Sequence, residues 1–180
     1  DLISSPSIDI IYIALPNSLH AKYIHECINQ KKNILVEKPA FIDFKDLLLL
    51  KDNLQKEKIF FTEAFMYRYL PYFKKVKEII ESNSLGKIIE INSTFSTKVY
   101  KQKNFLGIKI KKPDYSNRLF NKELGGGAIL DIGCYPVSLS TFINSLTYKV
   151  QFKDIILENV FTEHCDSGVD ISSNLKINFG

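Results

Sequence analysis

The stretch Ile34-Leu35-Val36-Glu37-Lys38-Pro39 decides the fold that the sequence predicts, because it places a cation at the end of a buried strand. Residues 33–36 form a short apolar run between two helix-like stretches, which favours a parallel strand of an α/β sheet. The proline halts regular structure and restricts the residue before it. Ligands of such sheets bind beyond the carboxyl ends of the strands. We therefore expect Glu37 and Lys38 where the chemistry occurs; a surface ion-paired turn is the alternative.

The residues around this stretch alternate between strand and helix patterns. Strands are expected in three short apolar runs, at 8–15, 33–36 and 59–61. The first run is nearly all apolar and is expected to be covered on both faces. One helical stripe begins at Ala21, and Asp43 can cap the next helix. This order predicts a partial Rossmann-like, doubly wound parallel sheet over residues 1–64.

The pattern then changes to one-sided strands, which predict an α+β domain over residues 65–180. An amphipathic helix is expected around 73–80. Half-buried strands are expected where apolar and polar residues alternate, over 89–96 and 169–179. Asp166-Ser167-Gly168 is a credible hairpin turn before the last strand. The predicted sheet of this domain is open and mostly antiparallel.

Composition excludes several classes of protein. With 45% hydrophobic and 24% charged residues, the chain has an ordinary globular composition. We find no apolar run of about 18 residues and no secretion signal, so neither a membrane partner nor export is expected. The odd, irregularly spaced cysteines (Cys27, Cys134 and Cys165) suggest neither disulfides nor a metal site, and favour the cytoplasm. The lysine-rich stretch 98–112 could contact phosphate, but without a nucleic-acid motif we interpret it as a solvated loop.

The sequence contains no Gly-x-Gly-x-x-Gly motif. The run Gly125-Gly126-Gly127 does not supply it, because the third glycine would fall at Leu130. Since no βαβ unit precedes residue 8, and the last expected strand finishes at the end of the sequence, we expect the chain to be a fragment.

Four motifs occur in a fixed order: IYIALPNSLH (11–20), VEKP (36–39), TEAFMYR (62–68) and GGGAILDIGCYP (125–136). Together they resemble the glucose–fructose oxidoreductase / inositol dehydrogenase / MocA family. The last motif is most similar to the branch of trans-dihydrodiol and xylose dehydrogenases. The resemblance implies an oxidoreductase that uses NAD or NADP on a sugar, polyol or cyclic diol. It also implies a homo-oligomer formed through the sheet of the second domain.

The resemblance makes Lys38 and Tyr135 a catalytic pair. Removing a hydride from an alcohol carbon requires that the hydroxyl proton leave as well. Tyrosine is a poor base at its usual pKa, and a nearby ammonium would favour the phenolate. Without the resemblance, Tyr135 could equally be a packed tyrosine.

Asp131 and Arg118 are expected to help hold substrate hydroxyls. The resemblance implies that Lys38 and Tyr135 also bind the substrate. Asp131 lies four residues before Tyr135, which places both on one helix face. Pro136 is expected to kink that helix, with Gly133 absorbing the bend. Capping or ion pairing is the alternative for Asp131, and a surface role is the alternative for Arg118.

Cofactor-binding positions also follow from the resemblance: Leu15, Pro16, Asn17, His20, Glu37, Lys38 and Arg68. Taken alone, Asn17 would be a helix N-cap, His20 a surface histidine of the first turn, and Arg68 a surface residue. The glycine run could expose N–H groups to a ligand or allow tight packing between domains. Two other functions stay open: a nicotinamide-nucleotide sensor without turnover, and an NAD-dependent enzyme of glycoside cleavage.

Overall fold

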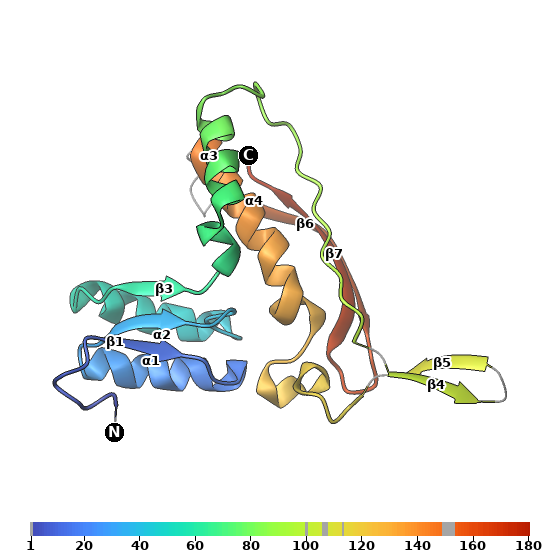
Figure 1. Cartoon of the computed structure of the whole chain (residues 1–180), viewed down its shortest axis with the longest axis horizontal. Helices are drawn as coiled ribbons and strands as arrows, with labels where there is room; N and C mark the ends of the chain where they lie inside the picture. Colours follow the sequence, from blue (N-terminus) through green and yellow to red (C-terminus); the bar gives the residue numbers. More distant parts are fainter. Residues whose placement is uncertain (1, 100, 106–107, 113, 149–153) are drawn as a thin grey trace.

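The computed structural model describes residues 2–99, 101–105, 108–112, 114–148 and 154–180. Its amino-terminal part is a parallel sheet of three short strands, ordered β1-β2-β3 (Figure 1). The strands are β1 (Ile10–Ile13), β2 (Asn33–Val36) and β3 (Phe61–Glu63). All three predicted strands are present, and β2 has the predicted bounds.

Two helices connect these strands and cover one face of the sheet (Figure 1): α1 (His20–Asn29) and α2 (Phe44–Lys56). The core lies between the sheet and the helices, and it includes Ile13, Ile24, Cys27, Ile34, Val36, Leu50 and Leu54. The carboxylate of Asp43 accepts a hydrogen bond from the backbone N–H of Lys45 at 2.8 Å, which confirms the predicted cap of α2.

The other face of β1 is exposed, so the expectation that the first strand is covered on both faces is wrong. Ile10 and Tyr12 are 50% and 54% exposed, whereas Ile13 is buried. Side chains alternate along a strand, so Ile10 and Tyr12 point away from the helices. Parallel strands joined in sequential order by right-handed crossovers have their helices on the same side, which is why α1 and α2 share one face.

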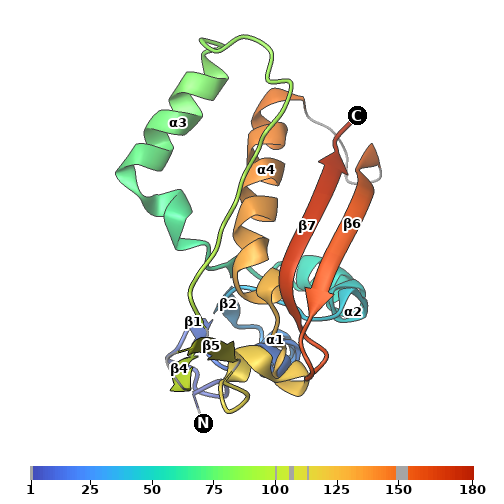
Figure 2. The same cartoon turned by 90° about the vertical axis from the view of Figure 1, so that its right-hand side faces the viewer.

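The second part of the chain combines helices with a long hairpin. Helix α3 (Pro71–Glu81) packs on α4 (Cys134–Thr147), where the rings of Phe73 and Phe142 lie 5.0 Å apart. Strands β6 (Ile156–His164) and β7 (Asp170–Asn178) pair antiparallel and lie beside α4 (Figure 2). The predicted turn between them is confirmed.

Short helical turns occur in both parts of the chain. They are η1 (Asn17–Leu19), η2 (Met66–Tyr69), η3 (Arg118–Phe120), η4 (Lys122–Leu124) and the π-type turn η5 (Ile129–Gly133). The turn η5 runs directly into α4.

Residues 89–96 were expected to form a strand, and this expectation is wrong. The segment is extended but pairs with no strand among the described residues, and Ile89 is 91% exposed. It lies along α4 instead: Tyr148 donates a hydrogen bond to the carbonyl of Ile88 at 2.7 Å, and Phe95 contacts Tyr135. Alternating apolar and polar residues make a segment suitable for a β-sheet. A strand forms only where a neighbouring strand offers hydrogen-bonding groups.

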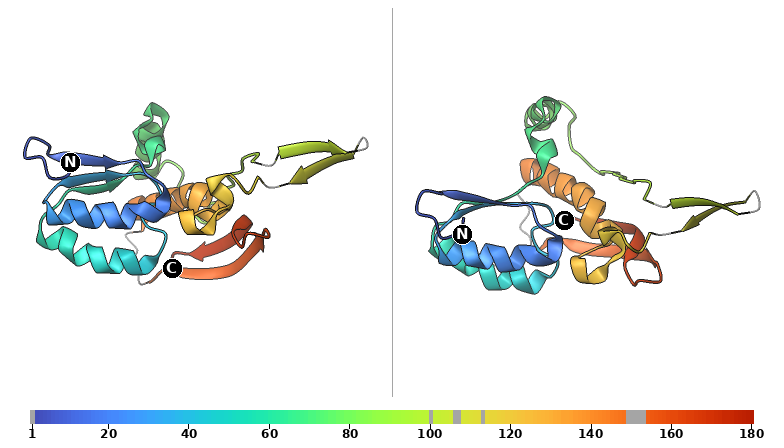
Figure 3. Two further views of the ribbon diagram at one scale, coloured as in Figure 1. Left: turned by 90° about the horizontal axis from the view of Figure 1, so that it is seen from below. Right: turned by 60° about the horizontal axis from the view of Figure 1, so that its bottom comes forward.

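The lysine-rich stretch, interpreted from sequence as a loop, contains an antiparallel hairpin. Strand β4 (Lys101–Phe105) pairs with β5 (Ile108–Lys112), and the pair projects away from the rest of the chain (Figure 3). Residues 100, 106, 107 and 113 and the side chains of both strands lie outside what the structure describes.

One helical stretch, Lys122–Thr147, is long and apolar enough to cross a membrane by length and composition, with a mean hydropathy of 1.2 in its most apolar window. We expected no such stretch, because the sequence has no uninterrupted apolar run of that length. The finding is weak evidence for a membrane span, since the core helix of a soluble protein passes the same test. The stretch carries Asp131, whose partners are described next.

Candidate functional site

Lys38 and Asp131 meet at the carboxyl end of the parallel sheet. The Lys38 ammonium lies 3.2 Å from the Asp131 carboxylate and also donates a hydrogen bond to the Asp131 backbone carbonyl. The two side chains are only 15% and 18% exposed, and 93 positions separate them in the sequence. This ion pair joins the loop after β2 to the turn before α4.

Arg118 places a second cation on the same carboxylate. Its guanidinium nitrogen lies 3.7 Å from the Asp131 oxygen, and its side chain is 52% exposed. The carboxylate of Asp131 is therefore held between an enclosed ammonium and a guanidinium that solvent still reaches. Both cations retain donors for further oxygen atoms.

Tyr135 completes the cluster one helical turn after Asp131. Its ring centroid lies 5.2 Å from the Lys38 ammonium, and its edge contacts involve Phe65 at 5.6 Å and Phe95 at 5.4 Å. The structure thus brings together the four residues predicted to bind substrate. The ammonium, however, lies over the face of the ring.

The pKa of Tyr135 is raised, which contradicts the expected stabilisation of its phenolate by Lys38. Burial is the largest cause, and electrostatic interactions with Cys134, Glu37 and Asp131 add to it. The hydroxyl of Tyr135 is therefore protonated at neutral pH.

The π-type turn η5 explains how Asp131 can accept from Lys38 through its backbone. The N–H of Cys134 donates to the carbonyl of Ile129, five residues earlier, which is the wide spacing of a π turn. Pro136 follows Asp131 at the same spacing but has no N–H to donate. The carbonyl oxygen of Asp131 therefore receives no backbone hydrogen bond from Pro136, and it accepts one from the Lys38 ammonium. The π-type turn lies where the bend near Gly133 was predicted.

Glu37 is held by a residue that the sequence analysis missed. The hydroxyl of Tyr12 donates a hydrogen bond to the Glu37 carboxylate from the exposed face of β1. This bond raises the pKa of Tyr12 because the carboxylate favours its protonated form. Ile13 pairs with Val36 in the parallel sheet. Tyr12 directly precedes Ile13 and Glu37 directly follows Val36, so the strand register could have indicated this contact.

Asn17 ties the two parts of the chain together. It is buried, makes no capping hydrogen bond in η1, and donates from Nδ2 to the carbonyl of Gly125 at 2.9 Å. A Cβ on Gly125 would lie 2.7 Å from Ile42 Cγ2 and 2.8 Å from Asn17 Cβ. The expected N-cap is therefore wrong, and Gly125 supports the tight-packing interpretation of the glycine run.

His20 is fully buried, so its interpretation as a surface histidine is also wrong. Its ring nitrogens lie 2.8 Å from the carbonyl oxygen of Pro39 and 2.9 Å from that of Leu15. Pro16 precedes η1, and Leu15 is 40% exposed at the same end of the sheet. His20 thus links the loop after β1 to the loop that carries Lys38.

Arg68 is placed elsewhere. It is exposed, and its guanidinium lies 4.8 Å from the centre of the Phe142 ring on α4. This is a cation–π contact within the second part of the chain. The structure does not bring Arg68 to the cluster around Asp131.

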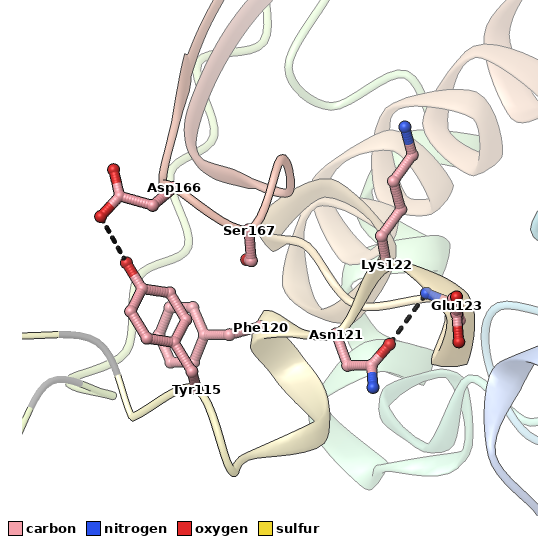
Figure 4. Close-up of a pocket in the computed structure, with 7 residues that line it drawn as sticks. All are labelled: Tyr115, Phe120, Asn121, Lys122, Glu123, Asp166 and Ser167. Atoms are coloured by element: carbon pink, nitrogen blue, oxygen red, sulfur yellow. Dashed lines mark hydrogen bonds between the residues drawn. The ribbon is translucent and has the colours of Figure 1, made fainter.

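Two hollows lie beside this region. A pocket of about 70 Å³ includes Asp131, Ile132, Gly127 and Asp170 in its lining. An open groove of about 730 Å³ is lined by none of the predicted site residues (Figure 4); there the hydroxyl of Tyr115 points to Asp166 and donates to its carboxylate at 3.1 Å. Among the described residues, no three His, Cys, Asp or Glu side chains gather as a metal site.

Two models of one oxidoreductase family match this chain. The model of the NAD-binding Rossmann fold matches residues 1–65, and the model of the GFO/IDH/MocA C-terminal domain matches residues 73–153. The chain belongs to the GFO/IDH/MocA family. The predicted family and fold class are thereby confirmed, and the match to an NAD-binding fold supports the predicted nicotinamide cofactor.

Curated members of the GFO/IDH/MocA family are similar over most of the chain. A trans-1,2-dihydrobenzene-1,2-diol dehydrogenase of Xenopus tropicalis is 31% identical over 79% of this chain and 39% of its own length. An NADP(+)-dependent D-xylose 1-dehydrogenase of Hypocrea jecorina is 30% identical over 84% of this chain and 37% of its own length. The chain therefore spans less than half the length of these relatives.

A solved structure shares the GFO/IDH/MocA fold seen here. It is a 3-ketoreductase from Actinomadura kijaniata, in complex with NADP and TDP-benzene, with a TM-score of 0.70 and 22% identity. The likeness covers 98% of this chain and 48% of that protein. At this identity it supports the fold alone.

Proposed function

We propose that the protein is an NAD(P)-dependent oxidoreductase that transfers a hydride between a nicotinamide cofactor and a sugar, polyol or cyclic diol. The observation that carries the proposal is the Lys38–Asp131 ion pair. It lies at the carboxyl ends of parallel strands, where α/β proteins bind ligands, and Tyr135 packs against it. The dehydrogenase activities named for the relatives support this reading.

The residues around Lys38 fit the nicotinamide end of a dinucleotide. Glu37 offers a carboxylate, held by Tyr12, that can accept hydrogen bonds from ribose hydroxyls. Leu15 and Pro16 offer apolar surface beside it. When bound, the cofactor supplies the hydride chemistry, and the protein groups orient the reactants. The choice between NAD and NADP stays open.

The cluster around Asp131 fits a substrate rich in hydroxyl groups. Arg118 and Lys38 donate hydrogen bonds, and Asp131 accepts them, so neighbouring hydroxyls can be held at defined angles. Because the pKa of Tyr135 is raised, its hydroxyl donates a proton to a carbonyl oxygen in the direction of reduction. In the direction of oxidation it must first ionise, so that rate should increase toward alkaline pH.

Three further features belong to the proposal. The chain divides into a cofactor domain, 1–64, and a substrate domain, 65–180.

Copies of the chain associate through the β6–β7 sheet, where apolar side chains of β6 are more than half exposed: Ile156, Leu157, Val160 and Phe161. Such exposed apolar surface is typical of interfaces. The protein works in the cytoplasm.

The test is a turnover assay of a longer protein that includes a pyrophosphate-binding loop, with a panel of sugars, polyols and cyclic diols, following nicotinamide absorbance. Substrate-dependent appearance of reduced cofactor in solution supports the proposal. Cofactor binding without oxidation of any substrate would instead indicate a sensor. Cleavage of a glycoside without release of reduced cofactor would indicate the glycoside-cleaving alternative.

A further inference from the structure

A buried histidine and a half-buried glutamate hold the backbone directly after Lys38. The Nδ1 atom of His20 lies 2.8 Å from the carbonyl oxygen of Pro39. On the next residue, the N–H of Ala40 donates to the carboxylate of Glu63 at 2.8 Å. Adjacent residues of one loop are thus bound from two directions, by α1 on one side and by the end of β3 on the other.

His20 also fixes this loop to its neighbour. Its Nε2 atom lies 2.9 Å from the carbonyl oxygen of Leu15, in the loop after β1. Carbonyl oxygens only accept hydrogen bonds, so the tautomer of the ring sets which of these two carbonyls receives its N–H. The ring therefore links the segments that follow β1 and β2, and Glu63 adds the end of β3.

These contacts bear on Lys38 through the backbone. Neither His20 nor Glu63 has a hydrogen bond with Asp131 or Tyr135 in the described structure. The ammonium of Lys38 must nevertheless lie within hydrogen-bonding reach of the Asp131 carboxylate, and small displacements of a catalytic group reduce rates strongly. A loop bound at both residues that follow Lys38 supplies this constraint.

We propose that His20 and Glu63 are positioning residues that hold the loop of residues 38–40 and thereby keep Lys38 on Asp131. The inference rests on the proposed function for the importance of Lys38. Its test does not require turnover.

The test measures how fast acetic anhydride acetylates individual lysines, resolved by mass spectrometry, in the 180-residue chain. Lys38 is compared with Lys32, whose ammonium donates to the carbonyls of Ser5 at 2.7 Å and Ile8 at 2.8 Å. Lys32 precedes β2, whereas Lys38 follows it, so the two lysines report on opposite ends of the sheet. Global unfolding exposes both lysines, whereas a loosened loop exposes Lys38 alone.

The informative variants are Glu63→Ala and Glu63→Gln. The alanine removes the acceptor for Ala40, and we expect the ratio of Lys38 to Lys32 acetylation to rise about fivefold, as for the loss of one ordinary hydrogen bond. Glutamine keeps a side-chain carbonyl oxygen that can accept from the Ala40 N–H. The ratio of Lys38 to Lys32 acetylation in Glu63→Gln should therefore stay near that of the wild type. A purely structural loss would change Lys32 and Lys38 together.

His20→Phe provides a second variant, which keeps an aromatic ring but removes both ring nitrogens and so both contacts with the carbonyls of Pro39 and Leu15. It should raise the same ratio. The proposal is overturned if the ratio is unchanged in both Glu63→Ala and His20→Phe, or if Glu63→Gln behaves like Glu63→Ala. The expected acetylation ratios in this chain, together with no dehydrogenase turnover in a longer protein that includes a pyrophosphate-binding loop, would refute the proposed function and leave the positioning role intact.

Discussion

The ammonium of Lys38 lies 3.2 Å from the carboxylate of Asp131, and this one contact joins the parallel sheet to the helix that carries Tyr135. The pair is mostly enclosed, so each charge depends on the other for solvation. Removing either partner should therefore affect both stability and chemistry. The predictions below separate these effects.

Tyr135→Phe and Lys38→Met should each reduce turnover by about 100-fold or more, the usual scale for acid–base groups. The phenylalanine preserves the ring contacts with Phe65 and Phe95 and removes only the hydroxyl. Steady-state kinetics on the complete protein measures the effect. Near-normal turnover in both variants would defeat the assignment.

Asp131→Ala should destabilise the fold by about 2 kcal/mol, because it leaves the enclosed ammonium of Lys38 without its counter-charge. Arg118→Ala is the matched control: it removes the other partner of the same carboxylate, but this guanidinium is half exposed. Its cost should stay below about 1 kcal/mol. Urea denaturation measures both. Equal losses would mean that the burial of the Lys38 pair has no energetic consequence.

Gly125→Ala should destabilise the chain more than Gly86→Ala. Both glycines have positive φ, +74° and +67°, so the backbone strain of an alanine is similar at the two positions. Only at Gly125 would the new Cβ meet other atoms, at 2.7 Å and 2.8 Å; at Gly86 nothing lies within 4 Å. We expect a difference of about 1–3 kcal/mol from this overlap. Thermal unfolding of the two variants decides it, and similar losses would exclude close packing at Gly125.

Glu63→Gln should stabilise the chain at neutral pH and lose this advantage in acid. Burial is the main cause that raises the pKa of Glu63 above its ordinary value of 4.5. A carboxyl with a raised folded pKa favours folding below its unfolded pKa, and that contribution is lost as pH increases through the folded pKa. The melting temperature of Glu63→Gln relative to wild type should therefore rise from pH 4 toward pH 7. A difference that stays constant would contradict the buried carboxylate.

Calorimetric titration of the 180-residue chain should show weak or no binding of NAD or NADP. No Gly-x-Gly-x-x-Gly motif is present to bind the pyrophosphate, so only the nicotinamide end finds partners. A longer protein that includes such a loop is the appropriate control. Micromolar affinity of this chain would show that the loop is dispensable.

The sequence by itself determined the features that depend on near neighbours. Strand 33–36, the Asp43 cap, the turn at Gly168 and the β-α-β-α-β order all follow from periodicity and from residues a few positions apart. The motifs also indicated that Lys38, Asp131, Arg118 and Tyr135 would gather. The strand, cap and turn signals survive in the sequence because the interactions that produce them are local, whereas the gathering of residues 93 positions apart was indicated by the family resemblance alone.

Only the tertiary structure decided what depends on the path of the chain. It left β1 exposed at Tyr12 and buried His20 and Asn17 against backbone carbonyls, and segment 89–96 has no strand partner in the part of the chain that the structure describes. It also placed the Lys38 ammonium over the Tyr135 ring, where burial raises the pKa of the phenol. Burial and long-range pairing are set by which distant segments approach, and a local pattern carries no information about that.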